Sequence, residues 1–83
     1  MLELLNQPVE VLSLFADGRI RPLRFRWRGR VVRVRRVTGE WARQEGIGRV
    51  HYFSVLAENA DYFELAYDVD LSTWRICRIW MEG

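Results

Sequence analysis

Arginine dominates one segment of the chain. Nine arginines and no acidic residue lie between Arg19 and Arg36, and the 13 basic residues of the whole 83-residue chain include no lysine. The planar guanidinium group donates hydrogen bonds in a fork that matches two oxygens of a phosphate or a carboxylate. The segment therefore predicts a surface that binds an anionic partner, or one that acidic side chains of the same fold neutralise.

The same segment has the alternating pattern of a β-hairpin. Leu23, Phe25 and Trp27 share one face of a predicted strand over residues 19–27, and arginines occupy the other face. Arg28-Gly29 suits a two-residue turn into the next strand. We therefore expect a hairpin with one apolar face and one basic face.

The register of this hairpin opposes two like charges. Pairing Trp27 with Arg30 across the turn places Arg24 directly opposite Arg33. Such a pair is destabilising by roughly 0.2–1 kcal/mol, so we expect an anion beside it. The same register matches the apolar faces, with Phe25 opposite Val32 and Leu23 opposite Val34.

Candidate binding residues follow from this arrangement. Nucleic-acid binders combine basic side chains with exposed aromatic rings, and Trp41 and Tyr52 are the aromatic residues most expected at the surface. The predicted nucleic-acid-binding residues are Arg24, Arg26, Arg28, Arg33, Arg35 and Trp41. The alternative is that Glu64 and Asp68, which share one face of a later strand, pair with these arginines, or that Glu40 or Glu45 does so.

Strand-like periodicity continues through most of the chain. We expect an all-β fold, a five- to six-stranded antiparallel meander curled into a small partly open barrel, as a single domain over residues 1–83. A sheet packed with one helix is the alternative. Residues 2–6 could form a helical turn, residues 43–48 are expected to form a loop, and a break in alternation at residues 35–39 predicts a bulge or bend. The expected strands span residues 8–15, 19–27, 30–41, 49–57, 62–68 and 74–80.

Catalytic and metal-binding patterns are weak. Cys77 is the only cysteine and His51 the only histidine, so neither a disulfide nor a multi-cysteine zinc site is available, and Cys77 is expected to be a buried structural thiol. We expect no enzyme activity, no cofactor, no metal and no small-molecule substrate. No apolar stretch approaches a membrane span and no signal peptide is evident, which favours the cytoplasm.

Several motifs carry a family resemblance. They are Phe25-Arg26-Trp27-Arg28-Gly29-Arg30, Val32-x-Val34-x-x-Val37, Gly39-x-Trp41, Tyr67-Asp68 and Trp74-Arg75-Ile76. Over residues 8–80 the chain resembles a small uncharacterised bacterial domain found alone or at the C-terminal tail of proteins related to Y-family DNA polymerases. The resemblance implies an association with DNA repair or replication and identifies no site residues.

The sequence is consistent with two functions. The first is a non-enzymatic accessory module that contacts phosphates of DNA or RNA through the hairpin arginines. The second is a protein-interaction or homodimerisation module whose arginines pair internally with acidic strand residues.

Overall fold

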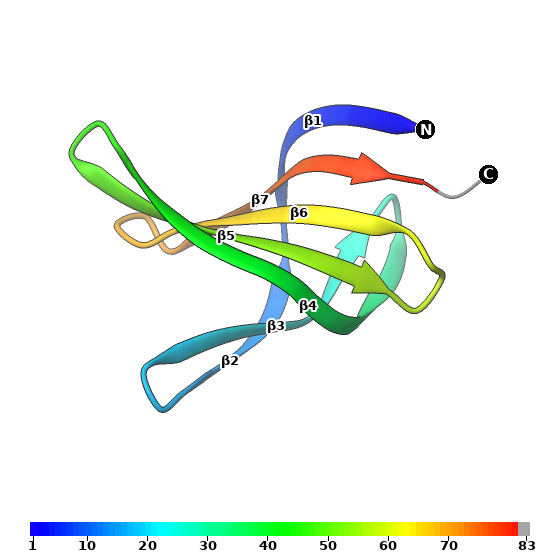
Figure 1. Ribbon diagram of the computed structural model, residues 1–83, viewed down its shortest axis with the longest axis horizontal. Helices are drawn as coiled ribbons and strands as arrows, with labels where there is room; N and C mark the ends of the chain where they lie inside the picture. Colours follow the sequence, from blue (N-terminus) through cyan, green and yellow to red (C-terminus); the bar gives the residue numbers. More distant parts are fainter. Residues whose placement is uncertain (82–83) are drawn as a thin grey trace.

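The computed structural model describes residues 1–81 and contains seven antiparallel strands in one open sheet (Figure 1). The order across the sheet is β1-β7-β6-β5-β4-β3-β2. The all-β prediction is confirmed, whereas the expected five to six strands and the barrel are wrong. The strands are β1 (Leu2–Val9), β2 (Val11–Ala16), β3 (Arg19–Trp27), β4 (Arg30–Glu45), β5 (Gly48–Ala57), β6 (Tyr62–Asp68) and β7 (Thr73–Trp80).

The first two strands explain the extra strand and the open sheet. β1 pairs with β7 and β2 pairs with β3, so two strands separated only by Glu10 lie at opposite edges of the sheet. The expected helical turn at residues 2–6 is instead part of β1, where Leu2 pairs with Trp80. This pairing partner is remote in sequence, which is why the local pattern did not reveal it.

The long strand β4 pairs with one neighbour along its first residues and with another along the rest. Its first residues pair with β3 as far as Arg33, and from Val34 onward it pairs with β5. The predicted pairs of Phe25 with Val32 and of Trp27 with Arg30 are confirmed, but Val34 pairs with Ala57 and not with Leu23. Bulges near residues 35 and 38 bend the strand at the change of partner, as the broken alternation predicted.

Tight turns set the hairpins. Asp17 and Gly18, and likewise Arg28 and Gly29, have positive φ angles of 54°, 72°, 49° and 77°. This backbone conformation belongs to the two-residue hairpin turns that favour glycine. The expected loop over residues 43–48 is mostly strand, because β4 continues to Glu45 and β5 begins at Gly48.

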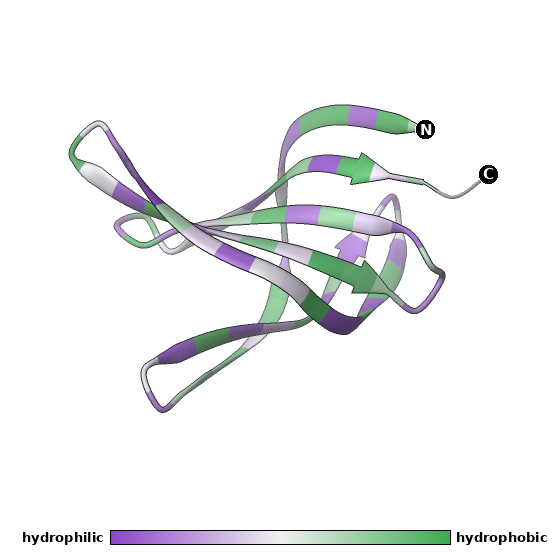
Figure 2. Ribbon diagram, in the orientation of Figure 1, coloured by the Kyte–Doolittle hydropathy of each residue, from purple (hydrophilic) through white to green (hydrophobic). Residues whose placement is uncertain are grey.

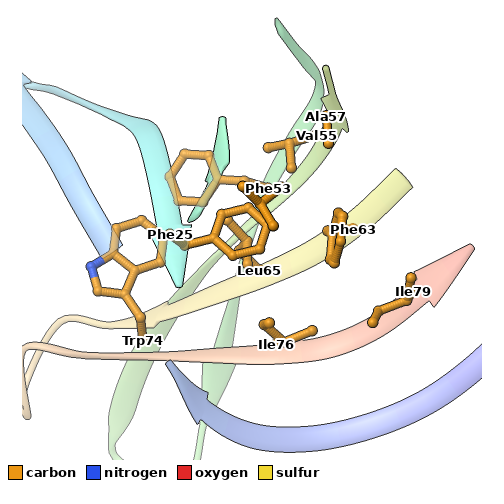
Figure 3. Close-up of a cluster of buried hydrophobic side chains, with 10 residues drawn as sticks. Phe25, Phe53, Val55, Ala57, Phe63, Leu65, Trp74, Ile76 and Ile79 are labelled. Carbon is orange, nitrogen blue, oxygen red and sulfur yellow. The ribbon is translucent and has the colours of Figure 1, made fainter. Parts of the chain in front are cut away.

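The sheet curls so that its concave face forms the core. Phe25 of β3 meets Phe63 of β6 edge to face, with ring centroids 4.9 Å apart, although their strands are not neighbours in the sheet (Figure 3). Hydrophobic and hydrophilic residues alternate along the strands (Figure 2), as expected for a sheet with one packed face. Residues 1–81 contain no helix long and apolar enough to cross a membrane.

Candidate anion-binding surface

A bulge in β3 gathers its arginines on the convex face of the sheet. Leu12 pairs with Arg24 and Ser13 pairs with Pro22, so Leu23 is an extra residue without a partner on β2. The bulge reverses the phase of the strand at this point. Before the bulge, the side chains of Ile20 and Pro22 face inward. After the bulge, those of Phe25 and Trp27 face inward. The exposed arginines of β3 on the convex face are Arg19, Arg21, Arg24 and Arg26.

The neighbouring strand continues this basic surface. Arg24 lies directly opposite Arg33, as predicted. Arg35 occupies the bulge that follows on β4, Arg36 comes next, and both are exposed. We call this set the convex arginine surface, consisting of Arg19, Arg21, Arg24, Arg26, Arg33, Arg35 and Arg36.

Glu64 and Asp68, two of the acidic residues expected to neutralise this surface, contact other groups. Glu64 forms an ion pair with Arg78 of β7, with 3.4 Å between its Oε2 and the arginine Nε. Asp68 accepts hydrogen bonds from the backbone N–H groups of Asp70 and Leu71 and so stabilises its own turn. Within residues 1–81 no acidic side chain forms an ion pair with Arg24 or with the other members of the surface except Arg19.

Arg28 differs from the other predicted binding residues. Its Nη2 lies 3.2 Å from Oε1 of Glu3, and its guanidinium carbon lies 4.5 Å from the centre of the Trp27 ring. The guanidinium of Arg28 therefore already contacts a carboxylate and an aromatic face. Arg28 holds β1 against the tip of the β3–β4 hairpin and is not part of the convex arginine surface.

A cleft opens where β3 and β4 diverge. It has a volume of about 460 Å³, and Arg21 and Arg36 line it from the two strands together with the backbone around Gly39. Arg19 also lines it and lies 3.9 Å from Glu40, an ion pair between exposed side chains that contributes little in water. In Figure 1 the β2–β3 and β4–β5 hairpins splay apart from this region. The cleft extends the basic surface inward between the strands.

Trp41 lies apart from the hairpin arginines. It is on the second half of β4, half-buried, and its ring stacks on Tyr52 with centroids 5.5 Å apart and an interplanar angle of 4°. The Tyr52 hydroxyl donates a hydrogen bond to Glu45, and Arg43 lies over the same ring. The hydrogen bond to Glu45, with burial and the charge of that carboxylate, raises the pKa of Tyr52 to about 12. The structure thus pairs the two aromatic residues expected at the surface with each other.

A second aromatic pair is more exposed, and the sequence analysis missed it. Tyr62 of β6 lies directly opposite Trp80 of β7, and these residues are 36% and 52% exposed. The strand pattern carries the signal, because both residues alternate with the buried Phe63 and Ile79 and so must face outward.

Cys77 and His51 are not part of a metal-binding cluster within residues 1–81. Among the described residues, no three His, Cys, Asp or Glu side chains gather where they could hold a metal ion. Cys77 sits at a bulge of β7 and is half-buried, not fully buried as expected. Desolvation, followed by the charge of Glu64, raises the pKa of its thiol, which disfavours the reactive thiolate.

Neither the curated proteins nor the solved structures compared with this chain include a significant match. A family model described as a domain of unknown function, DUF6504, matches residues 1–81, and the chain therefore belongs to the DUF6504 family.

Proposed function

We propose that this domain is a non-enzymatic accessory module that binds nucleic acid through contacts between phosphates and the convex arginine surface. The observation that carries the proposal is the pair of Arg24 and Arg33, which face each other across two strands with no acidic partner among residues 1–81. A phosphate beside this pair relieves the repulsion and accepts hydrogen bonds from both guanidinium groups. Binding thus offsets a cost that the free protein carries.

The arrangement of the other arginines suits a polymer better than a single ion. Alternate residues of a strand lie roughly 7 Å apart, so Arg19 and Arg21, and again Arg24 and Arg26, present charges in succession along β3. Arg33 extends the row to β4. A chain of phosphates can contact several of these side chains at once, and each such contact releases counterions.

A replication or repair setting in the cytoplasm is part of this proposal. It rests on the resemblance to domains at the tails of proteins related to Y-family polymerases. The proposed partner is DNA or RNA, and the module would add affinity to a larger assembly without performing chemistry itself.

The test is a salt titration of binding to a labelled oligonucleotide. Each phosphate contact contributes about −0.7 to the slope of log affinity against log salt for a single strand and about −0.9 for a duplex. Arg24→Ala and Arg33→Ala should each reduce the magnitude of the slope by about this amount. Arg49→Ala is the matched control, because it removes the same charge from β5, outside the surface.

Two results would contradict the proposal. One is the lack of measurable binding to any oligonucleotide at low salt. The other is a change of slope for Arg24→Ala and Arg33→Ala that is no larger than the change for Arg49→Ala.

One observation favours a second candidate, a protein-interaction or homodimerisation module. β2 forms an edge of the sheet, and its sequence from Val11 to Ala16 carries no charge. Leu12, Leu14 and Phe15 on this strand are 51%, 45% and 58% exposed. An uncharged edge strand with apolar side chains can pair with an edge of another chain.

A further inference from the structure

The exposed aromatic pair is continuous with the convex arginine surface. Arg36 lies opposite Leu56, Leu56 lies opposite Tyr62, and Tyr62 lies opposite Trp80. These residues form one row across β4, β5, β6 and β7 on the face away from the core. Because neighbouring strands are about 4.8 Å apart, the two rings lie roughly 10 and 14 Å from Arg36 along the row.

The row combines the two features that single-stranded nucleic acid requires. Arg36 also lines the cleft with Arg21, so the basic surface leads directly into the row. Leu56 is only 9% exposed and separates the charged end from the rings, whereas Tyr62 and Trp80 present aromatic area to solvent. Bases stack on such rings regardless of sequence, while arginines contact the backbone.

The acidic residue that shares the outward face of β6 with Tyr62, two positions away, is paired with an arginine. Glu64 is the acidic residue two positions beyond Tyr62 on the same face of β6, and Arg78 neutralises it. Arg78 itself lies two residues before Trp80 on β7. The negative charge nearest to the rings on these two strands is therefore compensated.

We infer that this row selects single-stranded nucleic acid, with Tyr62 and Trp80 stacking against unpaired bases and Arg36 contacting the adjoining phosphate. The inference rests on the proposed function, since the convex arginine surface supplies the rest of the affinity. In a duplex the bases stack on each other and cannot reach the rings. A rigid duplex also touches a curved surface over a short length, whereas a flexible strand can follow the curve from β3 to β7.

The experiment compares a fluorescein-labelled oligothymidine of about 12 nucleotides, a length within the usual range of such sites, with a hairpin duplex of matched charge. Binding is followed by fluorescence anisotropy. Tyr62→Ala and Trp80→Ala should each weaken binding of the single strand by about 5- to 150-fold, as stacked rings do elsewhere. Affinity for the duplex should remain unchanged.

Three further variants serve as controls. Trp80→Phe keeps an aromatic ring and should retain most of the affinity. Trp80→Leu keeps apolar area without the ring and should lose affinity as Trp80→Ala does, which guards against a folding defect in the smaller variant. Phe15→Leu removes another exposed ring, on β2, and should leave binding unchanged, because Phe15 contacts Tyr67 and lies outside the row.

The outcomes separate this inference from the proposed function. If Arg24→Ala and Arg33→Ala reduce the salt slope but the ring variants bind both oligonucleotides normally, the row is not a base platform and the phosphate surface stands. If the ring variants change the oligomeric state and not the affinity, the row is a protein contact. If the wild-type protein binds neither oligonucleotide, both proposals fail.

Discussion

Arg28 and Arg24 belong to the same hairpin, yet their side chains should affect stability with opposite signs. Arg28 contacts Glu3 and Trp27, and an exposed ion pair and a cation–π contact each contribute up to about 1 kcal/mol. Arg24 faces Arg33. Arg28→Ala should lower the free energy of unfolding by about 1 kcal/mol, whereas Arg24→Ala should raise it by a few tenths.

Urea denaturation at low salt without nucleic acid measures both changes. Both differences should shrink in high salt, because the charges are exposed and screened. A loss of stability in Arg24→Ala equal to that in Arg28→Ala would contradict this account of the hairpin.

The hydroxyl of Tyr52 should lose its proton at a higher pH than that of an ordinary tyrosine. Its folded pKa of about 12 lies above the usual value of 10.0, because the hydroxyl donates to Glu45 and ionisation would place two negative charges together. The folded state therefore holds this proton more tightly, and the resulting stability is present below pH 10 and lost as the pH rises toward 12.

The ultraviolet absorbance of tyrosinate follows this titration. The absorbance change at the highest pH, which we assign to Tyr52 and call the late phase, should be missing in Tyr52→Phe. The free energy of unfolding of this variant should also fall less steeply over the same pH range. Persistence of the late phase in Tyr52→Phe would assign it to another group.

The sequence predicted some of these residue contacts and missed others for a physical reason. The opposition of Arg24 and Arg33 follows from alternation and from the turn between them, which are both local. The contact of Arg28 with Glu3 joins residues 25 positions apart. It requires the sheet to curl until β1, at the opposite edge, comes close to the β3–β4 hairpin. Pairing between remote strands leaves no local pattern.

At the level of elements, the bulge at Leu23 decides which arginines are available. Arg19-Ile20-Arg21-Pro22 and Arg24-Phe25-Arg26-Trp27 each alternate regularly, and Leu23 places the two blocks out of phase. The alternating pattern predicted Leu23 on the inward face with Phe25 and Trp27, but its side chain is 39% exposed. Two regular blocks separated by one odd residue were the available signal for a bulge.

Deletion of Leu23 should therefore be tolerated. The shortened strand would alternate without interruption, with its arginines outward and its apolar residues inward, so we expect a change in stability within about 1 kcal/mol. Deletion of Arg26 is the matched control, because it leaves either Phe25 or Trp27 on the wrong face and should destabilise the fold by several times as much. Thermal unfolding followed by circular dichroism compares the two. Similar losses in both variants would mean that Leu23 has a structural role of its own.

At the scale of the whole molecule, the second candidate function would use the exposed edge at β2 as the contact between copies of the chain. If the second candidate function holds, light scattering should show a mass that rises from monomer to dimer with concentration. Leu14→Lys should keep the protein monomeric, because a charge on an edge strand opposes pairing with another chain. A wild-type monomer at every concentration would remove the homodimer and leave the nucleic-acid proposal intact.

The arrangement of the sheet was only partly predictable. The hairpins from β2 to β7 connect neighbours in sequence, and their turns are visible in the residues. The position of β1 depends on its pairing with β7, and the partner change within β4 depends on how the curled sheet covers its own core. Both are properties of the packed chain and not of any short segment.

The pairing of β1 also bears on how the chain folds as it is synthesised. The backbone N–H of Met81 donates to the carbonyl of Met1, and the amino terminus donates back across 80 residues. Closing so long a loop costs more entropy than forming any hairpin, and such non-local contacts slow folding. We expect the later strands to form hairpins soon after they are synthesised, while the backbone of β1 stays unpaired until β7 is available. Of the seven strands of the sheet, we therefore expect the one that comes first in the sequence to pair last.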